Sequence, residues 1–144
     1  MDSSSAPYVL VVDDDSQVRH VFGRVLELSG MAVTFAKDGV GGLAAARAHV
    51  PDAIVSDLGM PRMDGLALCR ALRRDPATKR VPILVVSGND AGQLRAALDA
   101  GCDAVLVKPC TGALLVSTIK RLLQLPSRHN DLFAASNGAE PAED

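Results

Sequence analysis

The chain is poor in aromatic residues, which make up 3% of its 144 residues, and tryptophan is absent. Apolar residues nevertheless account for 48% and charged residues for 22%, the balance of a globular protein that can bury a sizeable core. That core must therefore be built from Val, Leu, Ile and Ala, the mixture found where Ala-rich helices cover a buried parallel sheet. Length and composition together indicate one α/β domain.

Basic residues are not in excess either. The formal net charge is -2, and no block of Lys and Arg occurs. A groove for nucleic acid or a surface for anionic membranes would be expected to carry such a block. We therefore expect no DNA-binding domain in this chain.

Signals for secretion, membrane insertion and disulfide or metal frameworks are also missing. Residues 1–7 are Ser-rich and read as a flexible N-terminus without the parts of a signal peptide. No apolar run is long enough to span a bilayer. Cys69, Cys102 and Cys110 lack C-x-x-C spacing and are interpreted as reduced core thiols. These absences predict a cytoplasmic protein with no membrane segment.

What the sequence does contain is a strict alternation of short apolar runs and helical patterns. In segment 17–29, for example, apolar residues recur at the spacing of a helix with one buried face, and Gly30 ends it. The predicted strands are 8–12, 31–35, 52–56, 81–87 and 104–107. The predicted helices are 17–29, 40–49, 66–74, 91–100 and 112–125. This alternation predicts a doubly wound parallel sheet with helices on both faces.

Two of these helices have predicted starting points. Asp38 and Thr111 are suitable N-caps. Gly41 and Gly42 would each cost about 1 kcal/mol relative to Ala inside a helix, so helix 40–49 is expected to be short or frayed at its start.

The C-terminal part leaves two alternatives open. Residues 126–144 lack periodicity and predict a disordered tail. Leu132 and Phe133 within it are either a docking motif or two isolated apolar residues. The last helix carries more aliphatics than one buried stripe needs, which indicates either a partner or dimer surface or a broad core contact with one or two exposed aliphatics. These residues are Leu114, Leu115, Val116, Ile119, Leu122 and Leu123.

Polar residues gather at the carboxyl ends of the predicted strands, the edge at which open α/β sheets bind ligands. Taken singly, each has an ordinary explanation as a helix cap, a turn residue or a surface charge. Their combination at one edge is harder to explain that way. In chain order they are Asp13, Asp14, Asp15, Asp57, Ser87, Lys108 and Pro109.

The acidic cluster has a physical cost that a ligand would relieve. Two unit charges about 5 Å apart at an effective dielectric near 20 repel by roughly 3 kcal/mol. A hard divalent cation such as Mg²⁺ relieves that repulsion. A Lys and a hydroxyl at the same edge supply donors for a phosphoryl group, and a carboxylate can itself be the nucleophile. Asp57, alone after the middle strand, is the best placed to accept a phosphoryl group.

Four segments together resemble the receiver domain of two-component response regulators, in particular single-domain regulators of the chemotaxis type. They are YVLVVDDD at 8–15, DLGMPRMDG at 57–65, Ser87 with Gly88, and VKP at 107–109. The resemblance covers residues 8–125. It implies a flavodoxin-like (βα)5 fold with strand order 2-1-3-4-5. It also implies a phosphoacceptor signalling domain rather than an enzyme, one that catalyses only its own phosphorylation and dephosphorylation.

The resemblance also implies a metal-binding set. Asp57 would be both phosphoacceptor and Mg²⁺ ligand. Asp13 and Asp14 would form the acid pair, with Asp14 a direct ligand and Asp13 acting more through water. Gly59 would contribute its main-chain carbonyl. Asp15 matches no ligand position and is interpreted as a helix cap.

For the phosphoryl group, the resemblance implies that Lys108 pairs with its oxygens and that Ser87 moves to bond them after transfer. The bond before Pro109 would be cis. Two positions depart from the commoner pattern. Val105 stands where an aromatic switch residue is frequent, and Cys110 where Phe is frequent. Val105 has no ring to move into space left by Ser87, so we expect signalling to rely more on the loops and on helix 91–100.

Three other functions were compared with this one. A Mg²⁺-dependent aspartyl phosphatase of the haloacid dehalogenase type usually has a second Asp two residues after the first, where this chain has Gly59. A flavodoxin binds a phosphate in a hydroxyl-rich loop, whereas the corresponding loop here is acidic. A receiver that had become a pure interaction module would be expected to lack site residues, and none is missing.

The expected partners follow from the same resemblance. A sensor histidine kinase or a histidine phosphotransfer protein would donate the phosphoryl group, and a downstream protein would respond to the phosphorylated form. A homodimer is a further expectation. Met1 and the acidic, non-helical end favour a complete small protein; the alternative is the receiver fragment of a longer multidomain regulator or hybrid kinase.

Overall fold

The computed structural model describes residues 6–60, 62–88 and 91–125. These residues form one sheet of five parallel strands in the order β2-β1-β3-β4-β5. The strands are β1 (Tyr8–Val12), β2 (Ala32–Ala36), β3 (Ala53–Ser56), β4 (Ile83–Ser87) and β5 (Ala104–Val107). The helices are α1 (Ser16–Leu28), α2 (Gly39–Ala48), α3 (Gly65–Arg74), α4 (Ala91–Ala100) and α5 (Gly112–Leu123). The predicted fold class and strand order are confirmed.

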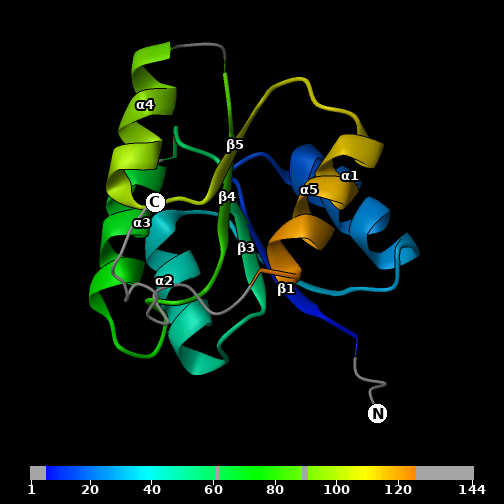
Figure 1. Ribbon diagram of the computed structural model, residues 1–144, viewed down its shortest axis with the longest axis horizontal. Helices are drawn as coiled ribbons and strands as arrows, with labels where there is room; N and C mark the ends of the chain where they lie inside the picture. The colour runs from blue at the N-terminus through cyan, green and yellow to red at the C-terminus, as the bar shows by residue number, and fades with distance from the viewer. Residues whose placement is uncertain (1–5, 61, 89–90, 126–144) are drawn as a thin grey trace.

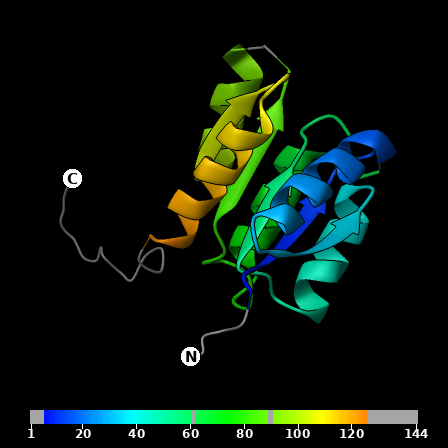
Figure 2. The same ribbon diagram turned by 90° about the vertical axis from the view of Figure 1, so that its right-hand side faces the viewer.

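The sheet separates two layers of helices. α2, α3 and α4 cover one face, and α1 and α5 cover the other (Figure 1, Figure 2). No helix of the described residues has the length and apolar character needed to cross a membrane. The predicted tail, 126–144, lies outside the described residues, as does most of the predicted N-terminal segment, 1–7.

The central strands are buried on both faces, which explains why the sequence reads there as almost continuous apolar runs. Successive side chains of a strand point to opposite faces. In β1, Leu10 and Val12 therefore join the core cluster under α2, α3 and α4. Val9 and Val11 join the cluster under α1 and α5. One strand thus stabilises both layers.

Four helices begin at a residue whose side chain accepts a hydrogen bond from a backbone N–H of the first turn, which is the usual N-cap arrangement. The caps are Asp15, Asp38, Asp64 and Thr111. The caps predicted at Asp15, Asp38 and Thr111 are confirmed. α1 is followed by Gly30 in the left-handed region, with a φ of 91°, as expected for a glycine that ends a helix.

The predicted fraying of α2 is wrong. The helix begins at Gly39, and its glycines serve close contacts. A Cβ on Gly42 would lie 3.0 Å from Val12 Cγ2, and one on Gly39 would lie 2.2 Å from the main-chain oxygen of Met63. The packing of α2 on β1 and on the segment after β3 therefore outweighs the low helix propensity of glycine.

The cysteine interpretation holds for two of the three thiols. All three are free, and Cys69 and Cys102 are buried. Burial raises the pKa of Cys69 to about 12, so this thiol stays protonated at neutral pH. Cys110 is only half-buried, because it follows β5 in the connection to α5. It nevertheless packs against the core cluster under α1 and α5, so the interpretation as a core thiol holds there in part.

The last helix makes a broad core contact. Leu115, Ile119 and Leu122 are buried, and Val116 and Leu123 pack against them while half-buried. Leu114 is 46% exposed. One exposed aliphatic on the helix is what the alternative of a broad core contact predicted.

Arg73 at the end of α3 joins this helix to the amino-terminal ends of β4 and β5. The side chains of Arg73 and Asp103 are both 13% exposed. Sequence analysis did not single out either residue. The guanidinium donates to four acceptors: the carbonyls of Lys79 at 3.1 Å, Val81 at 2.7 Å and Gly101 at 2.9 Å, and Asp103 Oδ2 at 2.8 Å.

We expect Arg73→Met to lower the free energy of unfolding by about 3–5 kcal/mol, because it takes this cation away from Asp103, whose side chain is only 13% exposed. Arg74→Met, in the exposed neighbouring residue, is the matched control and should change it by no more than about 0.5 kcal/mol. Urea denaturation followed by circular dichroism measures both values. Equal losses in the two variants would contradict this role of Arg73.

Candidate functional site

The acidic residues meet because β1 and β3 are neighbours in the sheet. Val12 pairs with Ser56, so the residues that follow them leave the sheet side by side. The Asp57 N–H donates to the Val12 carbonyl at 3.0 Å. Carboxylate oxygens of Asp13, Asp14 and Asp57 lie within 4.8 Å of one another. Asp13 is buried, Asp57 is half-buried and Asp14 is exposed, so the cluster is open to solvent on one side.

Lys108 reaches this cluster from the end of β5. Its Nζ lies 3.2 Å from Asp13 Oδ2 and 3.6 Å from Asp57 Oδ1. The Lys108 N–H donates to the Ser87 carbonyl at 2.6 Å, which continues the pairing of β4 with β5. The peptide between Lys108 and Pro109 is cis. The structure thus brings together the three acids and the lysine that the sequence singled out.

The ionisation of the site reflects opposing effects. Burial is the largest influence on Asp57 and raises the pKa of its carboxyl; Asp13 and Asp14 raise it further, while Lys108 and a hydrogen bond from the Leu58 N–H lower it. The net pKa of Asp57 is raised. Burial of Lys108 acts to lower its pKa, but Asp13 and Asp57 outweigh burial, and the net pKa is raised. Lys108 therefore stays a cation at neutral pH.

The other residues singled out by the sequence surround this cluster. Ser87 is buried at the end of β4. Gly59 is exposed, and a Cβ on it would meet nothing within 4 Å. Val105 is half-buried and packs against the core under α2, α3 and α4. Asp15 caps α1 through its side chain, and its N–H donates to Asp13 Oδ1 at 2.9 Å.

Gly65, which was not singled out by itself, fixes the path of the chain after Asp57. A Cβ on it would lie 2.3 Å from the main-chain oxygen of Asp57 and 2.8 Å from the Cα of Leu58. The Gly65 N–H donates to the Leu58 carbonyl at 2.9 Å. A glycine eight residues after Asp57 is the only sequence signal of this contact.

The donor set suits a hard divalent cation. Carboxylate oxygens are preferred ligands of Mg²⁺, and Asp13, Asp14 and Asp57 each offer one in a common volume. The exposed side of Asp14 leaves room for water and for an incoming ligand. These three residues could therefore hold a divalent metal ion.

A family model for the response regulator receiver domain matches residues 9–120. The chain belongs to this family. The predicted family is therefore confirmed. Receiver domains are signalling domains of two-component systems. The flavodoxin and haloacid dehalogenase alternatives are different families and are set aside.

Its sequence relatives include longer regulators. The transcriptional regulatory protein PrrA of Mycobacterium tuberculosis is 45% identical over 121 residues, which are 83% of this chain and 51% of PrrA. The response regulator MprA of Mycobacterium ulcerans is 41% identical over 129 residues, 89% of this chain and 55% of MprA. The chain thus spans about half of the length of these two regulators.

Solved receiver domains share the whole fold. The receiver domain of the sensor histidine kinase PA1611 of Pseudomonas aeruginosa is 29% identical to this chain, with a TM-score of 0.79. The match covers 84% of this chain and 100% of that one, whose structure has a magnesium ion coordinated in its active-site cleft. The chemotaxis response regulator CheY4 of Vibrio cholerae is 31% identical with a TM-score of 0.77, covering 82% and 99%.

The raised pKa of Asp57 predicts a pH-dependent stability. Because folding raises this pKa above its ordinary value of 3.8, the ionised carboxylate lowers the free energy of unfolding. This decrease in the free energy of unfolding begins as the pH rises past 3.8 and is complete above the raised pKa of Asp57 in the folded state. Asp57→Asn should therefore melt at a higher temperature than the wild type in metal-free buffer at neutral pH, with a gain that shrinks as the pH falls toward 3.8.

Differential scanning calorimetry across this pH range measures the effect. Asp99→Asn is a suitable control, since the Asp99 side chain is exposed and pairs with the exposed Arg95 of its own helix at 3.6 Å. A melting temperature of Asp57→Asn below that of the wild type at neutral pH would contradict the prediction.

Proposed function

We propose that the chain accepts a phosphoryl group on Asp57 from a phosphohistidine of a sensor histidine kinase or a histidine phosphotransfer protein, in a Mg²⁺-dependent reaction. The observation that carries the proposal is the position of Lys108 Nζ between Asp13 and Asp57, at 3.2 and 3.6 Å. A cation there can pair with phosphoryl oxygens that arrive beside Asp57.

The two oxygens of Asp57 have different surroundings. Oδ1 accepts a hydrogen bond from the Leu58 N–H at 2.8 Å and lies beside Lys108. Oδ2 has no hydrogen-bond partner within the described residues. A carboxylate oxygen of Asp57 attacks phosphorus while the bond to the donor nitrogen breaks, which gives an acyl phosphate and the free imidazole of the donor.

Mg²⁺ would be held by Asp13, Asp14, Asp57 and the main-chain carbonyl of Gly59. When bound, it supplies positive charge to the oxygens of the transferring group. Of the chain's own residues, Lys108 neutralises a further phosphoryl oxygen. Ser87, at the end of the adjacent strand, supplies a hydroxyl donor once it turns toward the phosphoryl group.

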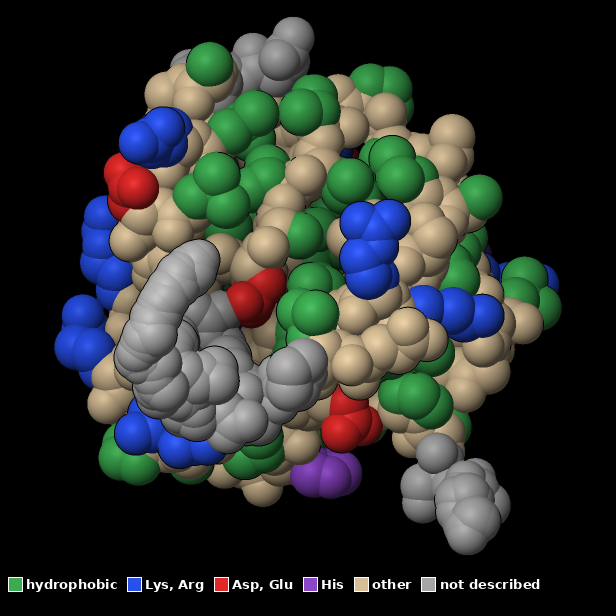
Figure 3. All heavy atoms as spheres, in the orientation of Figure 1, with side chains coloured by type: hydrophobic (Ala, Val, Ile, Leu, Met, Phe, Trp, Pro, Cys, Tyr) green, Lys and Arg blue, Asp and Glu red, His purple; other side chains and the backbone are tan. Residues whose placement is uncertain are grey.

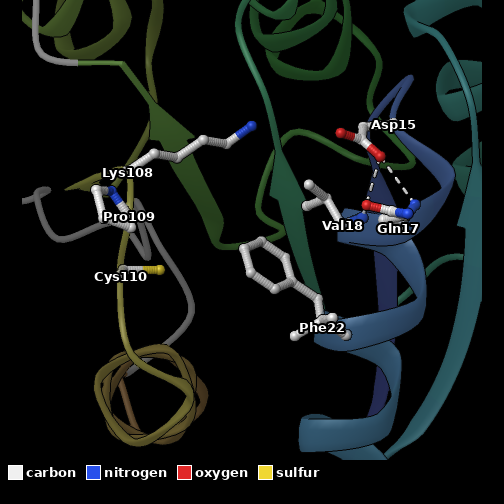
Figure 4. Close-up of a pocket in the computed structure, with 8 residues that line it drawn as sticks. Asp15, Gln17, Val18, Phe22, Lys108, Pro109 and Cys110 are labelled. Carbon is white, nitrogen blue, oxygen red and sulfur yellow. Dashed lines mark hydrogen bonds between the residues drawn. The ribbon is translucent and has the colours of Figure 1, made fainter.

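A groove beside the site suits the protein that delivers the phosphoryl group. It has a volume of about 540 Å³ and lies between α1 and the connection from β5 to α5. Figure 4 shows Val18 and Phe22 of α1 facing Pro109 and Cys110 across it, with Lys108 at the same end as Asp15. Because the groove shares Lys108 with the acidic cluster, a donor that covers it brings its phosphohistidine next to Asp57.

We propose that the face formed by α4, β5 and α5 transmits the signal to a partner after phosphorylation. Hydrophobic side chains gather on the face shown in Figure 3, over these elements. Leu98, Val107 and Leu114, one on each element, are exposed. Since Val105 has no ring to move, Ser87 would act on this face through the loops and α4, changing its shape for a downstream protein or a second copy of the chain.

Three finer points belong to the same proposal. The chain acts as a phosphoacceptor and catalyses only its own phosphorylation and dephosphorylation. The folded receiver covers residues 8–125. Its place of action is the cytoplasm.

The half-length match to PrrA and MprA favours a second candidate, in which the chain is the receiver part of a longer regulator. The chemistry at Asp57 would be the same in both cases. Mass spectrometry of the protein from its native source distinguishes them, because a longer regulator would exceed the 15.0 kDa of this chain.

Labelling with a small phosphodonor tests the phosphoacceptor role. With acetyl phosphate and Mg²⁺, intact mass spectrometry should show one added phosphoryl group, which is absent in Asp57→Asn and after chelation of the metal. Asp15→Asn is the matched control: Asn caps a helix as well as Asp, so its labelling should equal that of the wild type. Labelling that persists in Asp57→Asn would overturn the assignment.

A further inference from the structure

Arg19, to which sequence analysis assigned no role, contacts the main chain of Asp13 from within α1. The geometry points to Arg19 as a positioning residue that holds Asp13 and Asp14 in the arrangement needed to bind the divalent cation; this inference rests on the proposed function of the site. Arg19 Nη1 donates to the main-chain carbonyl of Asp13 at 2.7 Å. The Arg19 side chain is half-buried.

The carbonyl of Asp13 needs this donor because the chain leaves the sheet at this residue. The Asp13 N–H still follows the strand pairing and donates to the Ala36 carbonyl at 3.1 Å. Pairing with β3 ends one residue earlier, at Val12. Asp13 is 3% exposed, so water cannot readily replace a lost donor. A charged guanidinium at 2.7 Å makes one of the stronger classes of hydrogen bond.

Holding this carbonyl also orients the next residue. The Asp13 carbonyl and the Asp14 N–H belong to one planar peptide, so the direction of the carbonyl sets the direction in which Asp14 leaves the strand. The Asp13 carboxylate is held separately, by the Asp15 N–H at 2.9 Å and by Lys108 Nζ at 3.2 Å. Arg19 therefore holds the peptide between the two acids, a group that neither of those contacts includes.

Arg19 achieves this without occupying a carboxylate oxygen. Among the residues that the structure describes, no hydrogen bond or ion pair joins Arg19 to a carboxylate. Lys108, in contrast, lies against carboxylate oxygens of both Asp13 and Asp57. Arg19 thus fixes the acid pair while leaving its oxygens available to the cation.

Calorimetric titration of the full chain with Mg²⁺, without any phosphodonor, tests the inference. Hydrogen-bond partners of metal ligands typically contribute roughly 10- to 100-fold to metal affinity. We expect Arg19→Gln to raise the Mg²⁺ dissociation constant by about that range. Arg19→Lys should give an intermediate value, since it keeps a charged donor on a shorter, single-point side chain. Arg24→Gln, at an exposed position of the same helix, is the matched control and should bind as the wild type does.

Wild-type affinity in Arg19→Gln would overturn the inference, and so would an equal weakening in Arg24→Gln, which would indicate only a change in overall charge. Titrations are made where circular dichroism shows each metal-free variant to be folded. If Arg19→Gln does not fold, Arg19→Lys decides, and wild-type affinity in that variant overturns the inference. A positioning role also predicts that Arg19→Gln raises the Mg²⁺ concentration for half-maximal labelling. Its labelling rate at saturating Mg²⁺ should stay within about threefold of the wild type, because the ligands themselves are kept.

The outcomes separate this inference from the proposed function. If the wild type is labelled on Asp57 and Arg19→Gln binds Mg²⁺ normally, the inference alone fails. If Arg19→Gln weakens Mg²⁺ binding but the wild type is not labelled, the phosphoacceptor role fails and the positioning role stands. A wild type that does not bind Mg²⁺ contradicts both.

Discussion

The contact of Lys108 with Asp13 and Asp57 is the interaction on which the carboxyl edge of the sheet depends. Carboxylate oxygens within 4.8 Å of one another repel strongly in a half-buried setting. Lys108 offsets part of that repulsion from 3.2 and 3.6 Å. With all groups ionised, three carboxylates and one ammonium leave two negative charges, which is the charge that one divalent cation neutralises.

The parallel sheet makes this contact possible. Neighbouring strands lie about 4.8 Å apart, so β5 and β3, with β4 between them, are separated by about twice that distance. A long lysine side chain can cross such a gap, whereas a short polar one cannot. The Lys108 N–H bonds to the Ser87 carbonyl and the Asp57 N–H to the Val12 carbonyl, so both charged residues start from positions fixed by strand pairing. The same pairing places Ser87 between them.

A partly buried cation lies at each edge of the sheet, and the two have different surroundings. At the amino-terminal edge, Arg73 donates only to protein acceptors and ties α3 to β4 and β5. At the carboxyl edge, the Lys108 side chain remains 31% exposed and lies beside Asp13 and Asp57, in a cluster that is open to solvent at Asp14. Four of the five N–H groups of the Arg73 guanidinium are engaged by protein acceptors, whereas the more exposed Lys108 ammonium can also pair with a ligand. This difference separates the structural edge from the functional one.

The helices, the strands and the residue types of the site can be recognised from the sequence alone, because they depend on local pattern. The strands and helices followed from apolar spacing to within two residues at each end, and Asp15, Asp38 and Thr111 were recognisable as caps since a cap acts on its own helix turn. Asp13, Asp14, Asp57 and Lys108 stood out because parallel strands bring their carboxyl ends to one edge. The roles of Gly42, Arg73 and Arg19 can be recognised only in the folded structure, since each depends on a partner whose distance or orientation no local pattern specifies. From the sequence, Gly42 is a weak helix former, whereas in the structure it packs closely against Val12. Arg19 is a polar residue of α1 in the sequence, whereas in the structure its guanidinium donates to the Asp13 carbonyl.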